Sequence, residues 1–60
     1  MARILIAEDE AALREFVCRA LIHHGHEVVA VADGAEALVT LQEGGPFDLL
    51  LTDIMMPGLD

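Results

Sequence analysis

Three short apolar segments alternate with two longer segments of helical periodicity along the chain. The first apolar segment, residues 3–7, is β-branched at Ile4 and Ile6 and ends at an abrupt run of acidic residues. A continuous apolar run of this kind is typical of a strand that is buried on both faces of a parallel sheet. Because residues 26–31 and 47–52 have the same character, we predict three strands.

The first helical segment covers residues 10–23. Its apolar side chains recur at i, i+3, i+4, i+7 and i+8, which places them in one stripe along a helix. Two acid-before-base pairs at i,i+4 spacing, Glu10–Arg14 and Glu15–Arg19, would each add a few tenths of a kcal/mol. The stripe consists of Leu13, Phe16, Val17, Ala20 and Leu21.

Residues with known capping chemistry mark the ends of both helices. We expect Asp9 to cap the first helix and Gly25 to end it. Asp33 and Glu36 have the spacing of a capping box, with Asp in place of Ser or Thr, so the second helix should begin at Asp33. Residues 44–46, Gly-Gly-Pro, should stop it. The side chains expected to face inward are Leu38 and Leu41, with Ala35 and Ala37 nearby.

The resulting order, β-α-β-α-β, indicates an α/β fold. Since crossovers between parallel strands are right-handed, the strands should form one parallel sheet, with helices on both faces if the winding reverses. The 60 residues are enough for one small domain. A domain of this size buries only about 60% of the surface of its unfolded chain, so it lies near the limit of independent stability.

Composition excludes some partners and locations. Three basic residues stand against eleven acidic ones, for a net charge of −8, whereas nucleic-acid binding needs basic side chains at the phosphates. We therefore expect no direct binding of DNA or RNA. No apolar run approaches the ~18 residues of a membrane span, and Glu8 interrupts the N-terminal apolar stretch, so we expect neither a membrane segment nor a secretory signal. A single cysteine, Cys18, favours a cytoplasmic location.

Carboxylates follow two of the three predicted strands. Glu8 and Asp9 follow the first, and Asp53 follows the third. If these strands are neighbours in a parallel sheet, the three acids meet at its carboxyl edge, where open α/β sheets usually bind ligands. Clustered carboxylates repel one another, and Mg²⁺ relieves that repulsion. An Asp at such a site can be a nucleophile that forms an aspartyl-phosphate, although an acid after a strand is also ordinary loop or capping chemistry.

Four stretches of the chain resemble the receiver domain of two-component signalling systems: ILIAEDE, LREFVCRAL, ADGAEAL and FDLLLTDIMMPGLD. The last of these, with its Met56-Pro57 turn, is highly specific. Within the family, the sequence is similar to those of stand-alone receivers of the CpdR type. The resemblance implies a flavodoxin-like, doubly wound parallel sheet truncated to strand order 2-1-3. It also implies that residues 1–60 are the N-terminal part of a receiver domain.

The resemblance assigns roles to four residues. Glu8 and Asp9 would bind Mg²⁺, Asp53 would accept phosphate and also contact the metal, and Met55 would offer its backbone carbonyl to the metal. The phosphate would come from a histidine kinase or a phosphotransfer protein. The chain would then be a signalling protein rather than an enzyme in the ordinary sense.

The chain also departs from the family pattern. A receiver continues to a fourth strand with a Thr or Ser and a fifth with a Lys, and this sequence contains no lysine. We therefore expect impaired phosphorylation, and a non-phosphorylated interaction module stays open as an alternative. A metal-dependent phosphatase is disfavoured, because phosphatases that form an aspartyl-phosphate carry a second Asp two residues after the nucleophile. In this sequence that position is Met55. With residues 47–52 as the last strand, an exposed edge should favour a homo-oligomer.

Two other motifs carry little weight. Residues 44–45 are not a phosphate-binding loop, because no Gly-Lys-Ser/Thr follows them. A zinc site is also disfavoured, since the spacing of its candidate ligands matches no common finger. Those candidates are Cys18, His23, His24 and His26.

Overall fold

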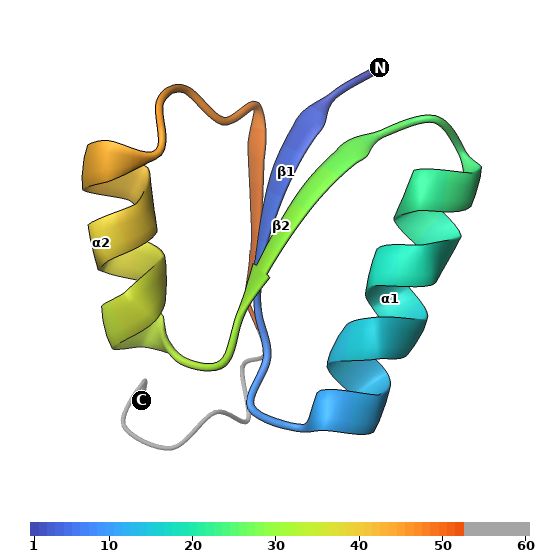
Figure 1. Cartoon of the computed structure of the whole chain (residues 1–60), viewed down its shortest axis with the longest axis horizontal. Coiled ribbons are helices and arrows are strands. Elements are labelled where there is room, and N and C mark those ends of the chain that lie inside the picture. Colours follow the sequence, from blue (N-terminus) through green and yellow to red (C-terminus); the bar gives the residue numbers. More distant parts are fainter. Residues whose placement is uncertain (53–60) are drawn as a thin grey trace.

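The computed structural model of the chain describes residues 1–52. Within this part, strands and helices alternate as the hydrophobic pattern predicts (Figure 1). No helix in residues 1–52 is long and apolar enough to cross a membrane. The elements in chain order are β1 (Arg3–Ala7), α1 (Ala11–His23), β2 (Glu27–Val31), α2 (Gly34–Glu43) and β3 (Leu49–Thr52).

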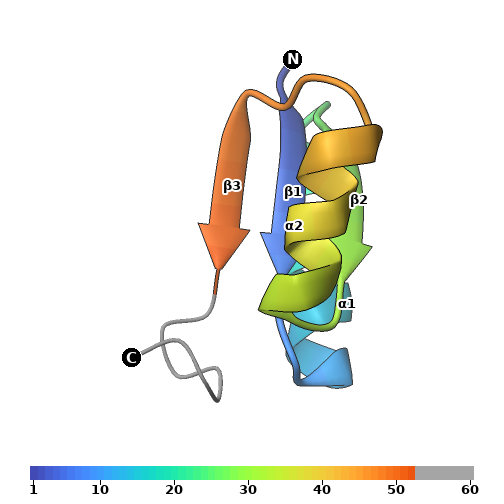
Figure 2. The same cartoon turned by 90° about the vertical axis from the view of Figure 1, so that its left-hand side faces the viewer.

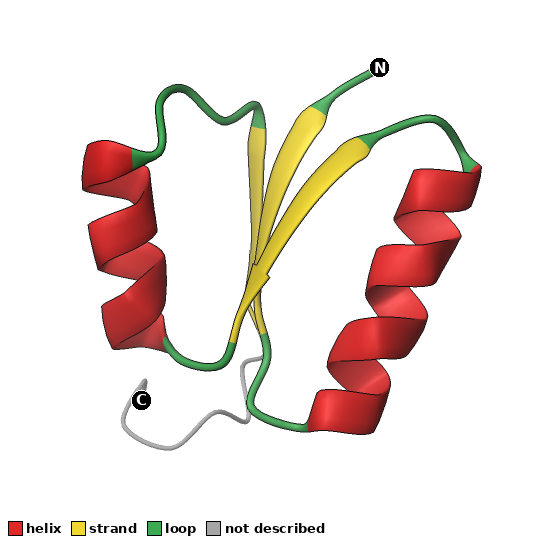
Figure 3. Cartoon of the chain, viewed as in Figure 1, coloured by secondary structure: helices red, strands yellow, loops and turns green. Residues whose placement is uncertain are grey.

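The three strands form one parallel sheet in the order β2-β1-β3, which confirms the predicted topology (Figure 2). In the central strand, Ile4 lies opposite Val28 of β2 and Leu49 of β3. Figure 3 shows the two helices on opposite faces of this sheet. The winding therefore reverses between the two crossovers, as in a doubly wound sheet.

The core is concentrated on β1, because this strand has a strand on each side and a helix over each face. Its four residues after Arg3 are buried, and Leu5 is fully inaccessible to solvent. On the face covered by α2, Leu5 and Ala7 form a cluster with Ala37. The partly buried side chains that pack against this cluster are Val29, Val31 and Phe47.

The start of α1 differs from the prediction. The N-cap is Glu10, and no side chain caps the helix, so the expected cap by Asp9 is wrong. The end is as predicted: Gly25 adopts a φ of +90°, which favours glycine. Its N–H donates to the carbonyl of Ile22, and that of His26 donates to Leu21, the bond pattern of a Schellman motif.

The apolar stripe of α1 remains largely open to solvent. None of the helix residues is buried, and Phe16 is 69% exposed. The predicted pair Glu15–Arg19 forms on the surface. The predicted pair of Glu10 with Arg14 does not form in the described part of the chain. Arg14 instead donates from Nη1 to the backbone carbonyl of Glu8, at 2.8 Å.

Helix α2 begins as its capping residues predict. The Asp33 side chain accepts a hydrogen bond from the backbone N–H of Glu36, at 2.8 Å. Of the four side chains expected to face inward, only Ala37 is buried. Leu38 and Leu41 instead line an open apolar groove beside β3. The helix ends at Glu43 with Gly44 as its C-cap residue, as predicted.

Strands β2 and β3 start slightly later than predicted, at Glu27 and Leu49. Since β3 pairs with β1 alone, its other side is an edge of the described sheet. Leu49 is 48% exposed and Leu50 is 44% exposed, so the edge is also apolar.

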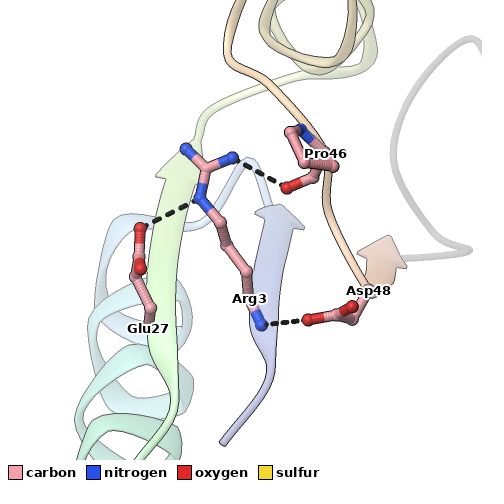
Figure 4. Close-up of polar contacts among 4 residues, drawn as sticks. All are labelled: Arg3, Glu27, Pro46 and Asp48. Atoms are coloured by element: carbon pink, nitrogen blue, oxygen red, sulfur yellow. Dashed lines mark hydrogen bonds and ion pairs between the residues drawn. The ribbon is translucent and has the colours of Figure 1, made fainter.

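Arg3 of β1 contacts residues of β2 and of the segment before β3, at the end of the sheet where the strands begin (Figure 4). Its backbone N–H donates to the Asp48 carboxylate at 2.7 Å, and its Nε lies 2.9 Å from the Glu27 carboxylate. Its Nη1 donates to the Pro46 carbonyl at 2.8 Å, and the guanidinium lies 4.3 Å from the centre of the Phe47 ring. This cluster links β1 to β2 and to the segment before β3 at the end away from the predicted site.

Candidate functional site

The candidate site lies at the carboxyl edge of the sheet, where both helices begin (Figure 1). Ala7 and Thr52, the last residues of β1 and β3, lie opposite one another. Glu8 and Asp9 follow Ala7 at this edge. Helix N-termini carry a partial positive charge, which favours anions and carboxylates nearby.

Hydrogen bonds of its backbone and its side chain anchor Glu8, which is only 7% exposed. Its backbone N–H donates to the carbonyl of Val31, at 3.1 Å. Its carboxylate accepts from the backbone N–H of Glu10 at 3.0 Å, and its backbone carbonyl accepts from Arg14. The strand-to-helix turn therefore has a fixed geometry, set by both the backbone and the side chain of one residue.

Asp9 has the opposite environment. Its side chain is exposed and makes no hydrogen bond or ion pair with any other residue among 1–52. An exposed carboxylate on a fixed turn can accept a ligand without first breaking an internal contact. This makes Asp9 the better suited of the two acids for direct contact with a cation.

Glu8 and Asp9 offer the donor type of the magnesium ion that the resemblance to receivers implies. Carboxylate oxygens are the hard ligands that Mg²⁺ prefers, and one or two of them commonly suffice beside water and phosphate oxygens. Within residues 1–52, no group of three His, Cys, Asp or Glu side chains is placed to hold a metal. The other two predicted contributors, Asp53 and Met55, lie outside the described residues.

The discounted histidines lie far along the chain from these acids and serve other contacts. Nδ1 of His26 accepts a hydrogen bond from the backbone N–H of Ala2, at 3.0 Å. The rings of His23 and His24 stack edge-on, with centroids 5.7 Å apart.

The sequence pattern alone did not indicate that the positive charge of Arg14 lies at this edge. Arg14 is the arginine that contacts the turn after β1, whereas Arg3 lies at the opposite end of the strands and Arg19 pairs with Glu15 on α1. The spacing of Arg14 from Glu10 indicated a helix-surface pair. The spacing of six residues from Glu8 is the signal that could have indicated the contact with the turn.

Comparison with known proteins decides the family. Residues 4–60 match the profile described as "Response regulator receiver domain". The chain belongs to the receiver domain family. The curated relatives include a response regulator receiver protein, a transcriptional regulatory protein and a sensor kinase. The receiver protein CpdR of Brucella abortus is 50% identical over 60 residues, which cover 100% of this chain and 49% of that protein.

The other relatives are longer. The transcriptional regulatory protein TcrA of Mycobacterium tuberculosis is 43% identical over 58 residues, which cover 97% of this chain and 22% of that protein. The sensor kinase CckA of Brucella abortus is 42% identical over 60 residues, which cover 98% of this chain and 6% of that protein. This receiver chain thus spans about half the length of CpdR and less of the others. No solved structure gives a significant match.

Proposed function

We propose that this receiver chain accepts a phosphoryl group on Asp53 as part of two-component signalling. The observation that carries the proposal is the pairing of Ala7 with Thr52. Glu8 and Asp9 leave β1 at this level, and Asp53 is the next residue after Thr52 in the sequence. The sheet thus brings the strand ends that precede these three acids in the sequence to one edge, which supports the proposal.

In this proposal, the Mg²⁺ ligands are the carboxylates of Glu8, Asp9 and Asp53 and the backbone carbonyl of Met55. When bound, Mg²⁺ offsets the negative charge that develops on the transferring phosphoryl group. A carboxylate oxygen of Asp53 attacks the phosphorus of a phosphohistidine. The new oxygen–phosphorus bond forms as the nitrogen–phosphorus bond breaks, and the imidazole leaves with that electron pair.

The proposed phosphate donor is a histidine kinase or a phosphotransfer protein. The support is that the relatives include a protein named as a sensor kinase as well as response regulators. The net charge of −8 argues against direct contact with nucleic acid. We place the chain in the cytoplasm, as a signalling module rather than an enzyme.

The test is phosphorylation by acetyl phosphate in the presence of Mg²⁺, followed by intact-mass spectrometry. We expect one phosphoryl adduct on the parent chain and none on an Asp53→Asn variant. An Asp48→Asn variant is the matched control, since Asp48 precedes β3 at the end away from the predicted site and Asn keeps an oxygen that can accept the N–H of Arg3, so labelling should be unchanged. Equal labelling of Asp53→Asn and the parent would refute the assignment.

A second candidate function is an interaction module that is never phosphorylated. The observation in its favour is the apolar surface that α1 leaves open, where Phe16 is 69% exposed. Exposed apolar side chains of this kind can bind a protein partner. Complete absence of labelling in the assay above, with Mg²⁺ bound, would favour this candidate. Hydrolysis of a chromogenic phosphate ester would instead point to a phosphatase, the least favoured of the three.

We also propose that two copies associate through β3. The support is an edge strand whose Leu49 and Leu50 are half exposed, next to the groove lined by Leu38 and Leu41. An unpaired strand edge is a template for pairing with another chain, and a two-fold axis would make the contact self-complementary. Small domains commonly gain stability by association.

A further inference from the structure

The turn between β1 and α1, residues 8–10, is held from three directions. Val31 of β2 accepts the N–H of Glu8, and Glu10 donates its N–H to the Glu8 carboxylate. The third contact comes from Arg14, whose Nη1 donates to the Glu8 carbonyl at 2.8 Å. This third contact ties the turn to the body of α1 through a side chain.

The contact with Arg14 matters because α1 begins without a side-chain cap. Without a cap from the Glu10 side chain, the first turn of the helix would fray more easily, and the turn before it would move as well. The hydrogen bond from the Arg14 guanidinium to the carbonyl of Glu8 opposes this motion. Asp9 then lies between Glu8 and Glu10, which are both held by hydrogen bonds. Arg14 is itself partly buried, so its side chain is better ordered than a fully exposed one.

We propose that Arg14 is a positioning residue for the metal site: by binding the Glu8 carbonyl, it holds the turn so that the exposed Asp9 carboxylate meets a divalent cation. The inference rests on the proposed Mg²⁺ binding of this same edge. Arg14 does not touch the metal in this proposal. It acts through the backbone that carries Glu8 and Asp9.

Charge alone predicts the opposite effect. Removing a positive side chain beside two acids makes their surroundings more negative, so a purely electrostatic role of Arg14 would make Mg²⁺ binding tighter when Arg14 is replaced. A positioning role makes binding weaker. The sign of the change in affinity therefore separates the two roles.

The experiment is a Mg²⁺ titration of the whole chain, followed by the backbone amide shifts of Glu8, Asp9 and Glu10. We expect Arg14→Gln to raise the Kd for Mg²⁺ about tenfold, the usual lower bound for a residue that orients metal ligands. Arg19→Gln is the matched control, since it removes the same charge from the surface of α1. We expect its Kd to stay within twofold of the parent, and Arg14→Lys, which keeps a donor, to fall between parent and Arg14→Gln.

Two results overturn the inference. One is a folded Arg14→Gln variant that binds Mg²⁺ as tightly as the parent or more tightly, while the parent binds normally. The other is a parent chain without any Mg²⁺ response, which would also remove the metal from the proposed function. If Arg14→Gln does not fold, the test is hydrogen exchange of the Arg14 guanidinium in the parent chain, measured with and without Mg²⁺. If the Arg14 contact favours Mg²⁺ binding, thermodynamic linkage requires that bound Mg²⁺ strengthens the contact, so exchange should be slower with Mg²⁺. Unchanged or faster exchange would overturn the inference.

Discussion

Ala7 and Thr52 form the last residue pair of the parallel ladder between β1 and β3. The two strands therefore end at the same level of the sheet. This relationship, more than any single side chain, makes a shared site for Glu8, Asp9 and Asp53 a physical expectation.

Replacing Asp9 should weaken Mg²⁺ binding without unfolding the chain. The Asp9 side chain is exposed and makes no hydrogen bond or ion pair within residues 1–52, so Asp9→Asn removes a charge and little else. We expect a Kd for Mg²⁺ at least about tenfold higher, measured by amide shifts, because a charged oxygen ligand is lost. Glu43→Gln, at the far end of α2, is the control. An unchanged affinity in Asp9→Asn would exclude this residue from the site.

The proposed association through β3 should depend on Leu50. We expect sedimentation equilibrium to show a dimer or larger assembly for the parent and a monomer for Leu50→Glu, because a charge in a paired apolar edge is costly. Val39→Glu is the matched control, since Val39 is also half exposed but lies on α2 and does not line the groove beside β3. A well-folded parent monomer at high micromolar concentration would contradict the proposal.

The cap of α2 should be measurable in the free energy of unfolding. Asp33→Ala removes the acceptor for the N–H of Glu36 and should cost about 1 kcal/mol in urea denaturation. Asp33→Ser keeps a side-chain oxygen at the same position and should cost clearly less. Equal losses in the two variants would show that the hydrogen bond is not the source of the stability.

The end of α1 offers a test of backbone conformation alone. An added Cβ at Gly25 would meet nothing within 4 Å, yet the φ of this residue is +90°. Gly25→Ala should therefore reduce the free energy of unfolding by about 1 kcal/mol through backbone strain rather than a clash. Gly25→Asn should cost less, because Asn tolerates this conformation better. A neutral Gly25→Ala variant would show that the helix end readjusts.

The linear pattern was sufficient for the elements and their ends. Period-3.6 and continuous apolar segments predicted both helices and all three strands within two residues of their observed starts. Asp33 and Gly25 mark helix ends because the hydrogen bonds and dihedral angles involved are local. The order β2-β1-β3 was different: it came from the family resemblance, since an apolar strand does not state which strand lies beside it.

Other features depended on the tertiary structure. The stripe of α1 predicted a face, but not that Phe16 on this face would be 69% exposed, because periodicity does not reveal what covers a surface. Arg14 has two candidate partners on its amino-terminal side within reach in the sequence, the side chain of Glu10 and the backbone of Glu8. The turn after β1 decided between them. Its path is set by contacts with β2 and by the packing of α1 on the sheet, and such non-local distances are not encoded in the spacing of residues along the chain.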